Sequence, residues 1–133
     1  NAMAFIDEFS RGHLIGSVKL ISFENDLNSL RLALKNAGAF KHLCHPAPHQ
    51  LLQKGEWSLK EDLLKWILIH GDFPEKFETV PSPHIILYDP FSIHTNSSLW
   101  TNDIFARLYQ YCAGRPMQLL TYSASTAVRA TLL

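Results

Sequence analysis

Two hydrophobic patterns follow each other in the first part of the chain, one at helical spacing and one typical of a strand. Apolar residues recur at helical spacing over residues 2–10, which predicts a helix that stops near Gly12. Residues 18–23 are rich in β-branched and aromatic side chains and predict a largely buried strand. A helix with one apolar face should follow, capped by Asn25 or Asp26 and stopped near Gly38.

The rest of the chain continues this alternation of strands and helices. Prolines followed by a glycine predict a loop and one short helix between residues 40 and 57. The further elements predicted are a strand over 63–69, a short helix over 73–77, a strand over 84–88, a helix over 100–112, a strand over 117–122 and a helix over 123–133.

Strands that alternate with helices imply parallel pairing through helical crossovers. The predicted fold class is therefore α/β, a Rossmann-like three-layer sandwich with a mostly parallel sheet. The 133 residues, 47% of them hydrophobic, are enough for one core, so residues 1–133 are predicted to form a single domain.

Charge and cysteine content narrow the class of protein. Twelve basic and twelve acidic residues give a formal net charge of zero, which excludes nucleic-acid binding by bulk charge alone. The sequence has no apolar run long enough to span a membrane and no secretory signal pattern. Cys44 and Cys112 lack metal-site or redox spacing and are predicted to be reduced core residues, which favours a cytoplasmic protein.

Acidic residues follow three successive predicted strands, at Glu24, Asp72 and Asp89. Ligands of such sheets bind outside the carboxyl ends of the strands, so these acids are predicted to converge on one crevice. A carboxylate at Glu24 can accept hydrogen bonds from both hydroxyls of a ribose, and Asp72 can accept one from the exocyclic amine of an adenine. Helix capping and turn formation are the alternative roles of these acids.

Two further groups of residues bear on metal binding and on nucleic-acid binding. A cluster of three histidines and Cys44 over residues 42–49 matches no structural zinc pattern, so no metal is predicted. Lysines 41, 54, 60 and 65 are scattered along the chain and are interpreted as a solvated face.

Six segments together resemble a known family. They are Leu-Ile-Ser-Phe-Glu (20–24), Leu-Leu-Gln-Lys-Gly-Glu-Trp (51–57), His-Gly-Asp (70–72), Tyr-Asp-Pro-Phe-Ser (88–92), Asn-Ser-Ser-Leu-Trp-Thr (96–101) and Leu-Thr-Tyr-Ser-Ala-Ser-Thr-Ala-Val-Arg (120–129). In this order they look like the methyltransferase domain of the bacterial tRNA 5-methylaminomethyl-2-thiouridine biosynthesis family, MnmC. That family's glycine-rich strand-loop would precede the present N-terminus and its last strands would follow Leu133, so a partial domain is expected.

The resemblance implies a class I methyltransferase that uses S-adenosyl-L-methionine and acts on the amine of a tRNA wobble aminomethyluridine. It implies cofactor binding by Glu24, Asn25, Asp72, Phe73 and Asp89. It also implies that Asp89 and Phe91 line the region of the transferred methyl group.

A degenerate methyltransferase-like domain that serves as a binding or assembly module is the alternative function. Because a truncated sheet would expose strand edges and core, a homo-oligomer is expected as well as the tRNA partner.

Overall fold

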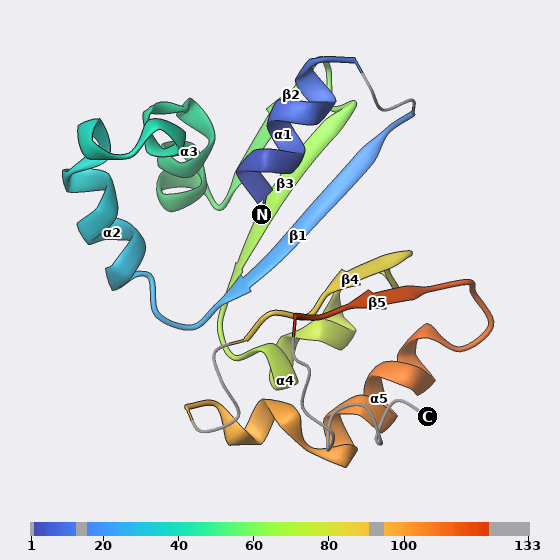
Figure 1. The fold of residues 1–133 in the computed structure, drawn as a ribbon. Helices are drawn as coiled ribbons and strands as arrows, with labels where there is room; N and C mark the ends of the chain where they lie inside the picture. Colours follow the sequence, from blue (N-terminus) through green and yellow to red (C-terminus); the bar gives the residue numbers. More distant parts are fainter. Residues whose placement is uncertain (1, 13–15, 91–94, 123–133) are drawn as a thin grey trace. The chain divides into compact units, whose positions relative to one another are not determined.

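The computed structural model describes residues 2–12, 16–90 and 95–122. It divides into two compact units, one over residues 1–76 and one over residues 77–133 (Figure 1). The predicted final helix over 123–133 lies outside the described residues.

The first unit is built on a three-stranded sheet with the order β1-β3-β2. Strand β1 (Val18–Glu24) pairs in parallel with β3 (Leu64–His70) along its whole length, from Val18 opposite Leu64 to Glu24 opposite His70. Strand β2 (Glu56–Leu59) pairs antiparallel with β3. The two parallel strands therefore end side by side, as the sequence predicts for the first two acids.

One face of this sheet carries the core of the first unit. Helices α1 (Ala2–Ser10) and α3 (Pro46–Lys54) contribute to the core. The indole N–H of Trp66, which faces Trp57 across the strands, donates to the Ser22 hydroxyl at 2.9 Å. The buried residues of this cluster are Ile6, Phe9, Ala47, Leu51, Trp57, Leu64 and Trp66.

Helix α3 has the end signals that its sequence predicts. Pro46 stands in its first turn, where a missing N–H is not needed, and the His45 ring accepts a hydrogen bond from the Ala47 N–H at 3.1 Å. Gly55 ends the helix in the left-handed conformation, with φ +76°.

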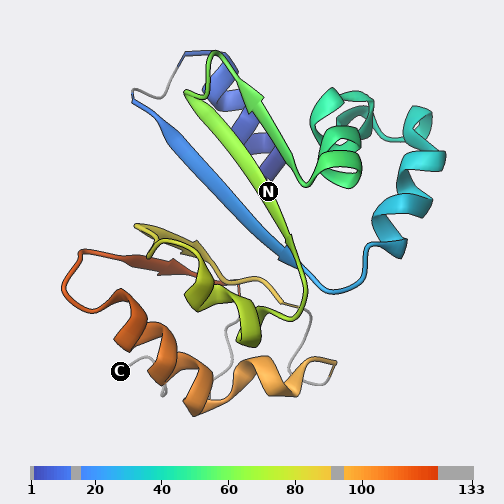
Figure 2. The ribbon, with the colours of Figure 1, turned by 180° about the vertical axis from the view of Figure 1, so that it is seen from behind.

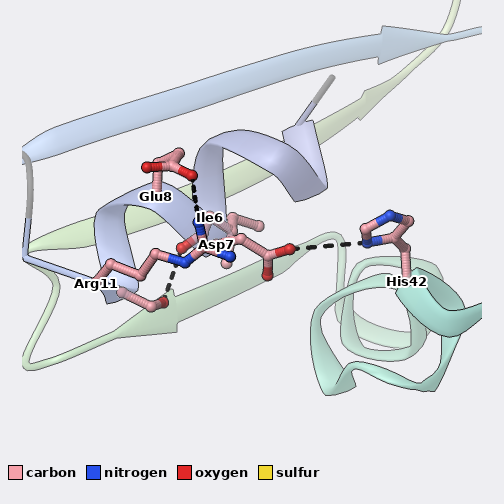
Figure 3. A network of polar contacts seen from close by, with 6 residues as sticks. Ile6, Asp7, Glu8, Arg11 and His42 are labelled. Atoms are coloured by element: carbon pink, nitrogen blue, oxygen red, sulfur yellow. Dashed lines mark hydrogen bonds and ion pairs between the residues drawn. The ribbon is translucent and has the colours of Figure 1, made fainter.

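Helix α2 (Asn28–Lys35) precedes α3, and two short 3-10 turns, Ala37–Ala39 and Lys41–Cys44, connect them. Figure 3 shows how this connection meets α1: the His42 ring lies 3.8 Å from the Asp7 carboxylate. At the end of α1, Arg11 pairs with Glu8 at 2.7 Å and the Ser10 hydroxyl donates to the Ile6 carbonyl. These side chains are exposed, so they add little stability but orient neighbouring elements.

The β2–β3 hairpin is absent from the sequence prediction. Its turn spans residues 60–63, in which Lys60, Glu61 and Asp62 have positive φ between 52° and 68°, and none of the usual Asn-Gly or Gly signals is present. Lys65 and Glu56 pair across the hairpin at 2.9 Å, and this hydrogen bond raises the pKa of the Lys65 ammonium. A turn without glycine conceals the hairpin from sequence reasoning.

The second unit has a two-stranded parallel sheet of β4 (Ile85–Leu87) and β5 (Gln118–Leu120). Helix α5 (Asn102–Cys112) connects them, and the Thr101 side chain caps it by accepting from the Ile104 N–H at 3.4 Å. Figures 1 and 2 show α5 along one side of this sheet. Among the residues of this unit that the structure describes, the buried hydrophobic side chains are Phe77, Tyr88, Trp100, Ile104, Phe105, Leu108 and Cys112.

Most predicted elements are confirmed, with shorter strands in the second unit. The short helix α4 (Phe73–Lys76) and 3-10 turns at Phe77–Thr79 and Ser97–Trp100 complete the described elements. The mixed α/β content is confirmed. A three-layer sandwich with one mostly parallel sheet is not, because the described strands form two separate sheets and β2 is antiparallel.

Both cysteines are free thiols. Cys112 is buried, as predicted, but the prediction of a core position for Cys44 is wrong. Cys44 is exposed because it lies on the turn between α2 and α3, where its thiol is 3.4 Å from the Ala37 carbonyl. No helix among residues 2–12, 16–90 and 95–122 combines the length and apolar character of a membrane span.

Candidate functional site

The adjacent ends of β1 and β3 form a compact polar edge in the first unit. The Gly71 N–H donates to the Glu24 carbonyl at 3.0 Å, which extends the parallel ladder by one step beyond the register pair Glu24 and His70. Gly71 has φ +142°, and a Cβ there would lie 3.0 Å from the Lys76 side chain. Glycine is therefore required where the chain leaves β3 and brings Asp72 to this edge.

Asn25 and Asp72 are 47 positions apart in the sequence but are directly bonded. The Asn25 side-chain amide donates to the Asp72 carboxylate at 2.8 Å. The His70 ring lies 3.3 Å from the Asn25 carbonyl. Asn25 thus fixes the orientation of the Asp72 carboxylate at the polar edge formed by the ends of β1 and β3.

Glu24 is exposed at the same edge, and its side chain bends back toward the start of α2. One carboxylate oxygen, Oε1, accepts from the Asp26 N–H at 3.1 Å. Among the described residues none donates to the other oxygen, which is an acceptor open to a ligand hydroxyl.

The prediction that Asn25 or Asp26 occupies the cap position of α2 is wrong. The cap position is Leu27, not Asn25 or Asp26, and it makes no side-chain cap bond. The Asp26 carboxylate nevertheless accepts from the Asn28 N–H at 2.8 Å and so serves the first turn from one residue further back.

Phe73 packs beside this polar edge. Its ring meets Phe23 of β1 edge-to-face, with centroids 5.2 Å apart. Phe73 is half-buried, so it supports the turn that carries Asp72 and also keeps part of the ring accessible.

Asp89 lies in the second unit, two residues beyond β4, and is exposed. Phe91 lies outside the described residues. The structure therefore brings Glu24, Asn25, Asp72 and Phe73 together, whereas the convergence of all three acids on one crevice stays a prediction.

Tyr88, directly before Asp89, is the anchor of that segment. Its ring is buried against Trp100, edge-to-face at 5.4 Å, and against Phe105 at 5.3 Å. Its hydroxyl donates to the Leu99 carbonyl, and burial raises the pKa of Tyr88 to about 12. Sequence reasoning missed this role because a tyrosine at the end of an apolar run has the pattern of any core residue.

Further contacts connect the same segment to β5. The Tyr88 N–H donates to the Leu120 carbonyl at 2.8 Å, and the Tyr122 hydroxyl donates to the Pro90 carbonyl at 3.2 Å. Three sequence segments, around residues 88–90, 99–101 and 120–122, therefore meet at one place in the second unit.

In the part of the chain that the structure describes, no group of three or more His, Cys, Asp or Glu side chains could hold a metal ion.

Comparison with known families decides the class of protein. Residues 34–133 match a family of S-adenosyl-L-methionine-dependent methyltransferases. The chain belongs to this family. The comparisons of this chain with curated proteins and with solved structures found no match.

Family membership gives this methyltransferase its cofactor, S-adenosyl-L-methionine. Asp72 and Asp89 fall within the matched residues, and Glu24 precedes them. The first unit fits the nucleoside part of that cofactor, because the open oxygen of Glu24 and the Asn25-held carboxylate of Asp72 are acceptors suited to ribose hydroxyls and an exocyclic amine.

Proposed function

We propose that this methyltransferase transfers a methyl group to the aminomethyl nitrogen of a modified wobble uridine in tRNA. The observation that carries the proposal is the meeting of three motifs in the second unit. Tyr88 bonds to both Leu99 and Leu120, so the segments that resemble the tRNA-modifying family most specifically meet at Tyr88, the residue directly before Asp89. Motifs that resemble a family and also contact one another support a shared site more strongly than isolated matches.

In this proposal the first unit holds the cofactor nucleoside. Glu24 accepts from the ribose hydroxyls and Asp72 accepts from the adenine amine. Asn25 keeps the Asp72 carboxylate in place through their 2.8 Å hydrogen bond, and Phe73 provides an aromatic wall. Asp89 and Phe91 line the region of the methyl group.

The chemistry demands positioning more than acid catalysis. The cofactor supplies an electrophilic methyl group on a sulfonium whose thioether leaves without protonation. Asp89 orients the substrate amine, stabilises the positive charge that develops on its nitrogen, and accepts the proton that the product ammonium releases, directly or through water. Tyr88 holds Asp89 on a rigid support through the buried contacts with Trp100 and Phe105.

The setting of the enzyme belongs to the same proposal. Residues 1–133 act as one methyltransferase domain in the cytoplasm, with tRNA as substrate and no resident metal.

Self-association is part of the proposal too. Ile85, Leu87 and Leu120 alternate onto one face of the β4–β5 sheet, and each is more than half exposed. Such a face favours contact with a second copy. Light scattering should detect a dimer or larger species, and a monodisperse monomer at high concentration would contradict it.

The experiment that tests the function is a methyl-transfer assay on tRNA that carries the aminomethyl group, with nucleoside mass spectrometry to locate the new methyl. Asp89→Ala should lower turnover by roughly 100-fold or more, with little change in the KM for the cofactor. Asp103→Ala, which removes another exposed carboxylate from the same unit, is the matched control and should retain turnover.

Unchanged turnover in Asp89→Ala would remove Asp89 from the mechanism. Absence of methyl transfer to any aminomethyluridine by a folded, cofactor-bound chain would contradict the proposed substrate. A folded chain that binds no cofactor would instead support the alternative of a non-catalytic assembly module.

A further inference from the structure

The charges of the neutral chain are unevenly distributed. Between Asp26 and Glu56 there is no acidic residue. The same stretch holds four of the twelve Lys and Arg residues, at positions 31, 35, 41 and 54, and three of the seven histidines, at 42, 45 and 49. Favourable charges at helix ends account for Lys35 and Lys54, which stand in last turns, but not for Arg31 or for the lack of acids.

This acid-free stretch folds into α2, α3 and the turns between them, and Figures 1 and 2 show the two helices side by side. The two helices line an open groove of about 370 Å³. Its lining residues are Arg31, Leu34 and Lys35 from α2 and His49, Leu52 and Gln53 from α3. The groove therefore has two permanent cations, an amide and an apolar floor, and no acidic side chain lines it.

The two cations stand on one face of α2 and are open to an external anion. Arg31 and Lys35 are one helical turn apart, a spacing that brings side chains together. Arg31 donates to the Asn28 amide oxygen at 3.1 Å, and within the described ranges no acidic side chain pairs with Arg31 or Lys35. The His49 ring is held against the Leu43 carbonyl at 2.9 Å, which gives the opposite wall a fixed shape.

The groove is connected to the candidate cofactor edge by a single helix. Asp26, beside Glu24, binds the first turn of α2, and Arg31 and Lys35 lie in its following turns. A helix of eight residues rises about 12 Å, so the basic pair lies within roughly that reach of the cofactor edge along α2.

We infer that the α2–α3 groove binds the phosphodiester backbone of the RNA substrate. Arg31 and Lys35 neutralise phosphates, and Gln53 donates to a phosphate or accepts from a ribose 2′-hydroxyl. Phe40, 54% exposed on the connection between the helices, offers a ring on which a base can stack. Cations combined with an exposed aromatic ring and an amide favour RNA over an acidic peptide or a lipid surface.

This inference rests on the proposed RNA substrate and extends it to a second contact surface. The test is fluorescence anisotropy of a labelled RNA stem-loop with the full chain over a series of KCl concentrations. In Arg31→Gln/Lys35→Gln, affinity should fall about tenfold at moderate salt, and the slope of log K against log salt should decrease by roughly 1.4, about 0.7 per lost phosphate contact.

Lys19→Gln/Arg115→Gln is the matched control, because it removes the same charge from exposed positions outside the groove. It should leave the slope close to that of the unmodified chain. Equal loss in both variants would show that only overall charge matters and would overturn the inference. Competition by polyglutamate or by anionic vesicles as effective as that by unlabelled RNA would overturn it too.

Inorganic phosphate and the cofactor separate the remaining outcomes. Phosphate alone should displace the labelled RNA only at millimolar concentrations. Displacement by phosphate at a concentration equal to that of the phosphate groups in the RNA would instead indicate a site for free phosphate. Calorimetric titration with S-adenosyl-L-methionine should give the groove variant the same affinity as the unmodified chain. If the chain binds the cofactor but the groove variant keeps the salt slope of the unmodified chain, only the groove inference is contradicted. If the groove variant lowers the salt slope but the chain does not bind the cofactor, only the proposed function is contradicted.

Discussion

The two units support an acid at a strand end in different ways. In the first unit, Glu24 and Asp72 are exposed, and hydrogen bonds between polar groups hold them, chiefly that of Asn25 with Asp72 at 2.8 Å. In the second unit, Asp89 follows a tyrosine that is buried among Trp100 and Phe105.

This difference indicates that the polar residues of the first unit serve ligand binding more than stability, whereas the aromatic residues of the second unit serve stability. Exposed polar pairs contribute little to folding, so the residues of the first edge are free to exchange their partners for a ligand. Buried aromatic contacts contribute several kcal/mol, so the second unit holds Asp89 rigidly at the cost of tolerance to mutation.

Trp100→Ala should destabilise the second unit by about 3–5 kcal/mol, because it removes a buried ring and leaves a cavity beside Tyr88 and Phe105. Urea unfolding followed by circular dichroism measures the change. Tyr109→Ala is the control, since that ring is 76% exposed on the same unit and its loss should change stability by no more than about 0.5 kcal/mol. Similar losses in both variants would show that the aromatic cluster is not the support of this unit.

Tyr88→Phe should cost about 1 kcal/mol at neutral pH, because the Leu99 carbonyl loses its donor. Burial raises the Tyr88 pKa to about 12 from an ordinary value of 10.0, so folding favours the neutral phenol. That contribution is complete below about pH 10 and is lost as the pH rises through 12. Melting temperatures from pH 8 to 12 should therefore fall less steeply for Tyr88→Phe than for Tyr109→Phe, and parallel curves would refute the buried role of the hydroxyl.

Glu61→Gly should stabilise the first unit by roughly 0.5–1 kcal/mol. Glu61 has φ +53° in the β2–β3 turn, a conformation unfavourable for a side chain by about 1–2 kcal/mol and only partly offset by the extra freedom of glycine when unfolded. Ser58→Gly, in the adjoining strand, should instead lower stability. If both glycines destabilise in thermal melts, the turn is not strained.

Asn25→Ala should have the smallest effect on folding, no more than about 0.5 kcal/mol, because its bond to Asp72 is exposed. Its effect on cofactor affinity should be larger, a loss of about fivefold, because the Asp72 carboxylate is no longer oriented. Parallel urea unfolding and calorimetric titration compare the two effects. A variant that unfolds readily yet binds the cofactor normally would reverse the proposed contrast.

Local patterns predicted most elements of both units. Spacing and end signals located α1, β1, α3, β3 and α5, because each has its own apolar periodicity or, as in α3, a proline at the start and a glycine at the end. The β2–β3 hairpin was missed because its turn carries three non-glycine residues at positive φ. The division of the strands into two sheets depends on pairing between distant segments, which local periodicity does not encode.

The candidate site was predicted in the same uneven way. The proximity of Glu24 and Asp72 follows from parallel strands that end together. The Asn25 to Asp72 bond depends on a register that pairs Glu24 with His70, and a shift of one residue would remove it. The anchoring of Tyr88 depends on Leu99 and Trp100, which come from a separate segment and have no periodic relation to β4.

The rest of the proposal depends on the claim that the shared end of β1 and β3 holds the cofactor nucleoside, which isothermal titration with S-adenosyl-L-methionine can measure. Glu24→Ala should weaken binding by roughly 10- to 100-fold, the loss expected for a charged acceptor, while Glu8→Ala, an exposed glutamate on α1, should leave it unchanged. Equal affinity for Glu24→Ala and the unmodified chain, both folded, would contradict the claim.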